Sequence, residues 1–258
     1  LINVNVEEIE MASDETEKSV KMSKPLKTED AAKIKVMLLN NTGELIPIFE
    51  GYEQKENYNV INNSINKLLT ENKLTVAYIG GSITYGVNAA PMNQNRYATL
   101  TTNWLREKFP DADITEVVAA HSGTGSDLGT VRIKEEVLSK NPDLVFIEFA
   151  VNDEGRADTK QCMEGMIRQI KEHNPDADVV FINSVSVNNM MHNFYDKGNL
   201  PTAIIYNNEV ADYYNIGSVN MGKALYNQTK SEGNTEPCGS DSGYMYDSAH
   251  PNNSGHKL

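Results

Sequence analysis

A hydroxyl, an imidazole and a carboxylate occur in this chain at positions from which they could carry out acyl transfer. Ser82 stands in GGSIT (80–84), directly after an apolar run, while Asp247 and His250 are three residues apart in DSAHPN (247–252). A serine hydroxyl is a poor nucleophile unless a neighbouring base takes its proton, and imidazole titrates near neutrality. A carboxylate that accepts the other ring N–H fixes the tautomer and steadies the imidazolium. The three residues are therefore predicted to be a nucleophile, its base and the group that orients the base.

The same chemistry needs donors for the oxyanion of the tetrahedral intermediate. Two further segments offer them: HSGTGSD (121–127), which contains Gly123, and AVNDEGR (150–156), which contains Asn152. The backbone N–H groups of Ser82 and Gly123 and the side-chain amide of Asn152 are expected to form the oxyanion hole.

The elements that must position these residues alternate regularly from residue 74 onward. Apolar runs predicted as strands cover 74–80, 113–120, 143–151, 176–185 and 215–221, and helical patterns cover 96–109, 126–140, 159–173 and 201–214. Apolar strands that alternate with amphipathic helices indicate a parallel sheet covered by helices on both faces, which is an α/β fold with about five strands. Ligands of such sheets bind beyond the carboxyl ends of the strands. The first three polar segments follow predicted strands and the fourth lies near the chain's end, so topology can bring all four together.

Residues 1–50 fit this pattern poorly. The first 30 residues mix charges with little periodicity and favour a mobile arm, and residues 34–49 resemble a hairpin of two short strands. We therefore expect an N-terminal extension of unassigned role at 1–50 and a hydrolase domain at 51–258. A helix is predicted within 58–73 from its apolar spacing.

Taken together, GGSIT, the glycine of HSGTGSD, the Asn-Asp of AVND and the D-x-x-H-P-N of DSAHPN resemble the four blocks of the SGNH hydrolases, or GDSL esterase/lipase superfamily. The resemblance covers about 74–256. It implies a three-layer α/β/α, flavodoxin-like fold and ester hydrolysis without a metal or other cofactor. Carried over position by position, it assigns Ser82, Asp247 and His250 to the triad and Ser82, Gly123 and Asn152 to the oxyanion hole.

Three features depart from the family pattern. Gly81 stands where many members have Asp, a variation found in carbohydrate-active branches. Ala150 replaces a usual Gly two positions before Asn152, which questions the backbone clearance there. A usual Asn before the second block is missing, with Ala119 and Ala120 in that region.

Simpler interpretations exist for each candidate taken singly. Ser82 could cap a helix, Gly123 could serve only a turn, and the segment 247–250 could be an Asx turn. Asn152 and Asp153 could cap the helix after the third predicted strand, and we expect a role of this kind for Asp153 rather than a part in catalysis.

Other candidates outside the four blocks have structural or substrate-binding interpretations. Trp104 is predicted to lie in the core, His173 to end a helix, and Arg156 to form a surface salt bridge rather than to contact substrate. His121 could line the pocket and His192 could belong to a substrate loop.

The net charge of −13 argues against nucleic acid and anionic membranes as partners, and no apolar run is long enough to span a bilayer. Histidine and cysteine spacing predicts no metal site. Cys162 and Cys238 could pair or stay as thiols.

The expected function is that of a serine esterase that hydrolyses small acyl esters, acetyl foremost, on a glycan or small molecule. The alternatives are a lysophospholipase or thioesterase of the same superfamily, or a non-catalytic glycan-binding domain. Secretion is expected only from the substrate class, and the sequence predicts no oligomeric state.

Overall fold

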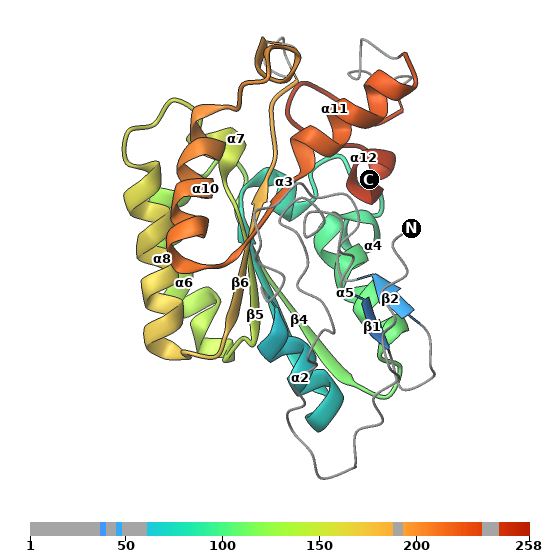
Figure 1. Ribbon diagram of the computed structural model, residues 1–258, viewed down its shortest axis with the longest axis vertical. Coiled ribbons are helices and arrows are strands. Elements are labelled where there is room, and N and C mark those ends of the chain that lie inside the picture. Colours follow the sequence, from blue (N-terminus) through green and yellow to red (C-terminus); the bar gives the residue numbers. More distant parts are fainter. Residues whose placement is uncertain (1–36, 40–44, 48–60, 188–192, 234–242) are drawn as a thin grey trace, which may run out of the picture.

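The computed structural model describes residues 37–39, 45–47, 61–187, 193–233 and 243–258 (Figure 1). Its centre is a parallel sheet of five strands, in the order β4-β3-β5-β6-β7. The strands are β3 (Lys73–Gly80), β4 (Asp113–Ala120), β5 (Leu144–Glu148), β6 (Asp178–Asn183) and β7 (Gly217–Asn220). Counted from β3, this is the 2-1-3-4-5 order of flavodoxin-like folds, which confirms the expected architecture.

Helices cover both faces of this sheet because its central strands are apolar on both faces (Figure 1). One core cluster joins the sheet to α6, α8 and α10, and a second joins the other face to α2, α3 and α5. These six helices are α2 (Asn62–Glu71), α3 (Ser82–Tyr85), α5 (Tyr97–Lys108), α6 (Ser126–Glu136), α8 (Thr159–His173) and α10 (Thr202–Tyr214). The fold is thus a three-layer α/β/α sandwich.

The remaining helices and helical turns connect the strands and the six helices that cover them. They are α4 (Met92–Asn95), η1 (Leu138–Lys140), α7 (Ala150–Asp153), η2 (Tyr195–Lys197), α11 (Met221–Ser231) and α12 (Asn253–Lys257). In Figure 1, α3, α7, α11 and α12 gather at the end of the sheet where β3, β5 and β6 finish. This end therefore carries the segments expected to form the site.

Several of the predicted strands and helices are longer than the observed ones. The strand predicted at 143–151 ends at Glu148, because α7 begins at Ala150 and the amide of Asp153 donates to the carbonyl of Phe149 at 2.9 Å. Helix α11 was not predicted, although it follows the short fifth strand directly.

The predicted hairpin is confirmed in its two strands. β1 (Met37–Leu39) and β2 (Leu45–Pro47) pair antiparallel, while the turn between them lies outside the described residues. Most of the remaining N-terminal segment also lies outside them, so the division at residue 50 stays a prediction.

Trp104 corrects one expectation. It was predicted to be a core residue, but 39% of it is exposed on α5. Helix α5 packs largely against β4, the edge strand of the sheet, and an edge strand offers less surface to cover a large ring.

Candidate active site

Ser82 opens α3 immediately beyond the carboxyl end of β3. The N-cap of this helix is Gly81, so Ser82 is not the capping residue. Its hydroxyl instead meets an imidazole: Ser82 Oγ lies 2.9 Å from His250 Nε2. This is the geometry that a nucleophile and its base require.

Asp247 holds the other side of the same imidazole. Its two carboxylate oxygens lie 2.9 and 2.8 Å from His250 Nδ1, and Oδ1 also accepts from the amides of Ala249 and His250. The segment is thus an Asx turn as well as a carboxylate–imidazole pair. Partial burial raises the pKa of Asp247, but the Ala249 amide and the His250 ring and amide lower it further, to below its ordinary value. The carboxylate therefore stays ionised and keeps the proton of the ring on Nδ1.

The chain segment that carries Asp247 and His250 is hydrogen-bonded to neighbouring parts of the chain. A β-bridge joins Met245 to Pro251, and the carbonyl of Ser248 accepts from the amide of Val187 at 2.7 Å. Val187 follows β6, so the segment is anchored to the sheet next to the end of β5. These bonds explain how His250 reaches a serine 168 residues earlier.

The two expected oxyanion segments lie on either side of Ser82. Gly123 follows β4 and Asn152 lies in α7 after β5, while β3 runs between those two strands. A Cβ placed on Gly81 would lie 2.7 Å from Asn152 Oδ1 and 3.3 Å from the carbonyl oxygen of Thr124. Both segments therefore meet at the residue preceding the serine, and Gly123 adopts a φ of +73° that favours glycine.

The contacts of Gly81 also account for one departure from the family pattern. An Asp at this position would overlap the Asn152 side chain where it now stands. Ala150, the second departure, is buried in a small cluster with Ala203 and Ile204, so its methyl group packs against α10. The structure offers no physical account of Ala119 and Ala120 beyond their burial in β4.

The remaining polar candidates have structural partners. Arg156 pairs with Asp127 and Asp158 at 3.0 and 2.9 Å, which confirms the predicted salt bridge. Asp153 accepts from the amide of Ser126 at 2.9 Å and so caps α6, the helix after β4, whereas the prediction placed it at the helix after the third strand.

The outcomes for the histidines and cysteines are mixed. His121 is exposed and 3.0 Å from Glu136, and His173 ends α8 as predicted. His192 lies outside the described residues. Cys162 makes no disulfide with a described residue, and Cys238 is not among those residues.

Sequence reasoning missed two buried charged residues beneath Ser82. Glu148, at the end of β5, is 1% exposed and bonded to Ser184 and Thr84. Arg132 of α6 donates to the carbonyl oxygens of Gly80, the last residue of β3, and of Ala119, the residue before the last one of β4. The available signal was a single carboxyl residue inside the apolar run LVFIEFA.

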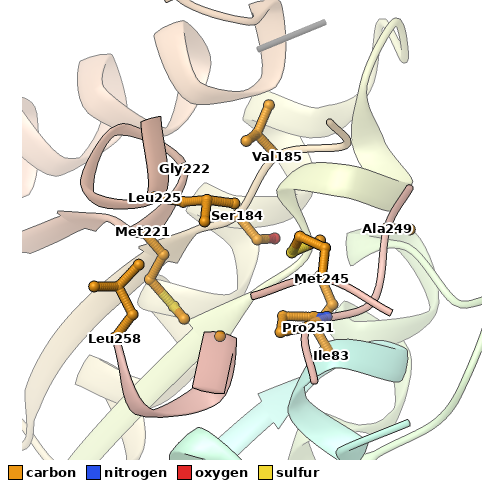
Figure 2. Close-up of a pocket in the computed structure, with 11 residues that line it drawn as sticks. Ile83, Ser184, Val185, Met221, Gly222, Leu225, Met245, Ala249, Pro251 and Leu258 are labelled. Atoms are coloured by element: carbon orange, nitrogen blue, oxygen red, sulfur yellow. The ribbon is translucent and has the colours of Figure 1, made fainter. Parts of the chain in front are cut away.

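An apolar pocket of about 30 Å³ is lined by residues that are next to Ser82 and His250 in the chain (Figure 2). One side is formed by Ile83, which follows Ser82, and by Ala249 and Pro251, which flank His250. The facing side is formed by Met221 and Leu225 of α11 and by Leu258.

Within the described parts of the chain, no group of three or more His, Cys, Asp or Glu side chains could hold a metal ion. No helix in those parts is both long and apolar enough to cross a membrane.

A parallel α/β/α sheet with a serine, histidine and aspartate at its carboxyl rim defines an SGNH-type hydrolase. Residues 78–258 match the model of the GDSL-like Lipase/Acylhydrolase family. The chain belongs to this family, and so to a class of carboxylic ester hydrolases.

Solved structures agree with this assignment. A two-domain esterase (CEX) active on acetylated mannans is 28% identical, with a TM-score of 0.63 over 76% of this chain and 50% of that one. The present chain thus spans about half the length of that esterase. A mutant of Axe2, an acetyl-xylooligosaccharide esterase from Geobacillus Stearmophilus, is 18% identical over 71% of this chain and 89% of that one, with a TM-score of 0.53.

A lipase/acylhydrolase from Enterococcus faecalis is 21% identical over 72% of this chain and 90% of that one, with a TM-score of 0.52. The Axe2 and Enterococcus faecalis structures are only 18% and 21% identical to this chain, so their similarity shows a shared fold and nothing more. No curated protein shows a significant match to this chain.

Proposed function

We propose that this protein is a serine esterase that removes small acyl groups, acetyl foremost, from a carbohydrate through a covalent acyl-serine intermediate. The observation that carries the proposal is the continuous chain from Ser82 Oγ to His250 Nε2 at 2.9 Å and from His250 Nδ1 to Asp247 Oδ2 at 2.8 Å.

In the first half-reaction, Ser82 Oγ attacks the ester carbonyl carbon while His250 Nε2 takes the hydroxyl proton. The carbonyl π-electrons move to the oxygen, and the N–H groups of Ser82 and Gly123 and the amide of Asn152 bind the resulting anion. The intermediate collapses, the bond to the alcohol oxygen breaks, and the imidazolium returns its proton to that oxygen. Asp247 keeps the ring oriented throughout.

The second half-reaction repeats these roles with water as the nucleophile. His250 accepts a proton from water as the water oxygen attacks the acyl carbon, and the second tetrahedral intermediate forms in the same oxyanion hole. Its collapse breaks the bond to Ser82 Oγ, which regains the proton from His250. The products are the free acid and the original enzyme.

A small acyl group and a sugar alcohol are favoured by two observations. Tyr246 and Tyr85 are 56% and 42% exposed, next to Asp247 and one helical turn after Ser82, so aromatic surface is available close to the site. The similar two-domain esterase acts on acetylated mannans.

Ser82→Ala is the direct test of the serine mechanism. Turnover of p-nitrophenyl acetate should fall by about 10³-fold or more, whereas Ser254→Ala on the exposed start of α12 should keep wild-type turnover. Undiminished turnover in Ser82→Ala would reject the mechanism.

A substrate panel tests the specificity. We expect acetylated mannan or xylan to be deacetylated faster than esters of increasing acyl length. Preference for long-chain esters would support a lysophospholipase or thioesterase, and binding of glycan without turnover or fluorophosphonate labelling would support a glycan-binding domain.

A further inference from the structure

A buried carboxyl lies directly under the turn that presents Ser82, and the mechanism above does not use it. Glu148 is 1% exposed at the carboxyl end of β5, the strand beside β3. A carboxyl in such a place needs hydrogen-bonding partners, because an unpaired buried charge or polar atom is costly.

Each oxygen of this carboxyl has one hydroxyl donor. Ser184, just after β6, donates to Oε1 at 2.5 Å, and Thr84 donates to Oε2 at 3.1 Å. Thr84 Oγ1 also lies 2.9 Å from the hydroxyl of Tyr97. Because the Thr84 proton is given to Glu148, Tyr97 must be the donor in that second bond. The hydrogen bonds thus form a relay in one direction, because Tyr97 donates to Thr84 and Thr84 donates to Glu148. Ser184 donates to the other carboxyl oxygen of Glu148.

Glu148 holds the nucleophile turn on both sides of Ser82. Its backbone carbonyl accepts from the amide of Gly81 at 3.3 Å, and its side chain accepts from Thr84, two residues after the serine. A Cβ on Gly80 would overlap Thr84 Oγ1, so the glycine allows the threonine to fold back onto the carboxyl.

The relay also joins three elements of the fold at one carboxyl group. Tyr97 begins α5, Thr84 belongs to α3 and Ser184 follows β6. All three are buried, and Ser184 also lines the apolar pocket beside the site (Figure 2). Burial raises the pKa of the Glu148 carboxyl, while the bonds from Ser184 and Thr84 lower it less. The turn therefore has little freedom to move relative to the sheet.

We propose that Glu148 is a positioning residue for catalysis: through Gly81 and Thr84 it fixes the α3 turn so that Ser82 Oγ meets His250 Nε2. This inference rests on the proposed function of Ser82. A displacement of about 1 Å in a reacting group can cost on the order of a hundredfold in rate. Loss of the relay should therefore lower kcat and leave KM nearly unchanged.

The chain contains a matched control for this relay. Tyr78 and Thr102 form a second buried tyrosine–threonine hydroxyl pair at 3.0 Å, between β3 and α5 and away from the α3 turn. Deleting the hydroxyl of Thr102 removes the same kind of bond without touching residues 81–84.

The experiment compares Thr84→Val with Thr102→Val on p-nitrophenyl acetate, at a temperature where both are folded. We expect kcat to fall at least tenfold in Thr84→Val with KM within twofold, to stay within twofold of wild type in Thr102→Val, and to recover in Thr84→Ser, which keeps the hydroxyl. Wild-type kcat in folded Thr84→Val, or equal losses in both valine variants, would overturn the proposal.

Glu148 itself gives an independent comparison that decides the matter if Thr84→Val does not fold. Glu148→Gln keeps partners for both hydroxyls and should retain kcat within about fivefold, whereas Glu148→Leu should lose tenfold or more with KM unchanged. Equal kcat in the two variants would overturn the proposal. Ser82→Ala separates the two claims, because turnover that survives in that variant rejects the proposed function whatever the variants of Glu148 do.

Discussion

His250 Nε2 lies 2.9 Å from Ser82 Oγ, although the two residues are 168 positions apart in the chain. The serine is fixed by the end of β3, and the histidine by a short segment bonded to the residues after β6. The distance between Ser82 Oγ and His250 Nε2 therefore depends on two separate segments of the chain, and each segment can be tested separately.

Asn152→Ala tests the oxyanion hole. The side chain of Asn152 stands beside Gly81, the residue before Ser82, and we propose that its amide N–H donates to the developing anion. We expect kcat for p-nitrophenyl acetate to fall by about 10²- to 10³-fold with KM little changed, because the contact is made mainly in the transition state. Asn103→Ala, which removes an exposed amide on α5, is the control. A loss of less than about threefold in Asn152→Ala would exclude the amide from the hole.

Gly81→Ala tests the close approach of the two oxyanion segments. Its new methyl group would lie 2.7 Å from Asn152 Oδ1, so the amide must move, and we expect kcat to fall by roughly 10- to 100-fold. Gly165→Ala is the matched variant in α8, where the nearest atom is at 3.4 Å. That change should leave kcat unaltered and raise the free energy of unfolding by about 0.5–1 kcal/mol. Wild-type kcat in Gly81→Ala would contradict the described packing.

Tyr246→Ala tests whether the exposed ring beside Asp247 binds the carbohydrate. We expect KM for acetylated oligosaccharides to rise by about three- to tenfold, as for the loss of one aromatic contact, with kcat/KM for p-nitrophenyl acetate within twofold of wild type. Tyr213→Ala removes a ring that is 81% exposed on α10 and serves as control. Equal changes on both substrates would exclude a sugar-specific role for Tyr246.

His256 should make the fold sensitive to mild acid. Burial lowers the pKa of this imidazole to about 4, helped by the nearby His250, whereas an unfolded histidine titrates near 6.5. Between these values the unfolded chain binds a proton that the native state does not. The free energy of unfolding therefore falls as the pH drops from about 6.5 to 4, by about 3 kcal/mol in total.

Urea unfolding of His256→Asn against wild type, followed across this pH range, measures that contribution. Asn can still accept from the amide of Tyr97, which now donates to His256 Nδ1 at 3.3 Å. We expect a shallower pH dependence in this variant and an unchanged one in His173→Asn. Parallel curves for wild type and His256→Asn would contradict the assignment.

The sequence predicted the parts of the site that lie in short local patterns. Ser82 and the 247–250 segment each follow a recognisable arrangement of glycine, serine, aspartate and histidine, and the parallel topology brings their segments to one rim. The three central strands were found because their apolar runs are buried on both faces.

The relay through Glu148 could not be predicted from short local patterns. It joins residues 84, 97, 148 and 184, and no local spacing relates a glutamate in one strand to hydroxyls on three other elements. The prediction for Trp104 was wrong for a related reason. Helical spacing shows which face of a helix a residue lies on, but not how much of an edge strand that face covers.

The central claim is that Ser82 is a nucleophile activated by His250. Brief exposure to a fluorophosphonate probe, followed by mass-spectrometric localisation of the adduct, tests it most directly. One adduct on Ser82 in wild type, none in Ser82→Ala and slow labelling in His250→Ala are the predicted results. An intact, folded wild-type protein that is not labelled, or is labelled at another residue, would contradict the account.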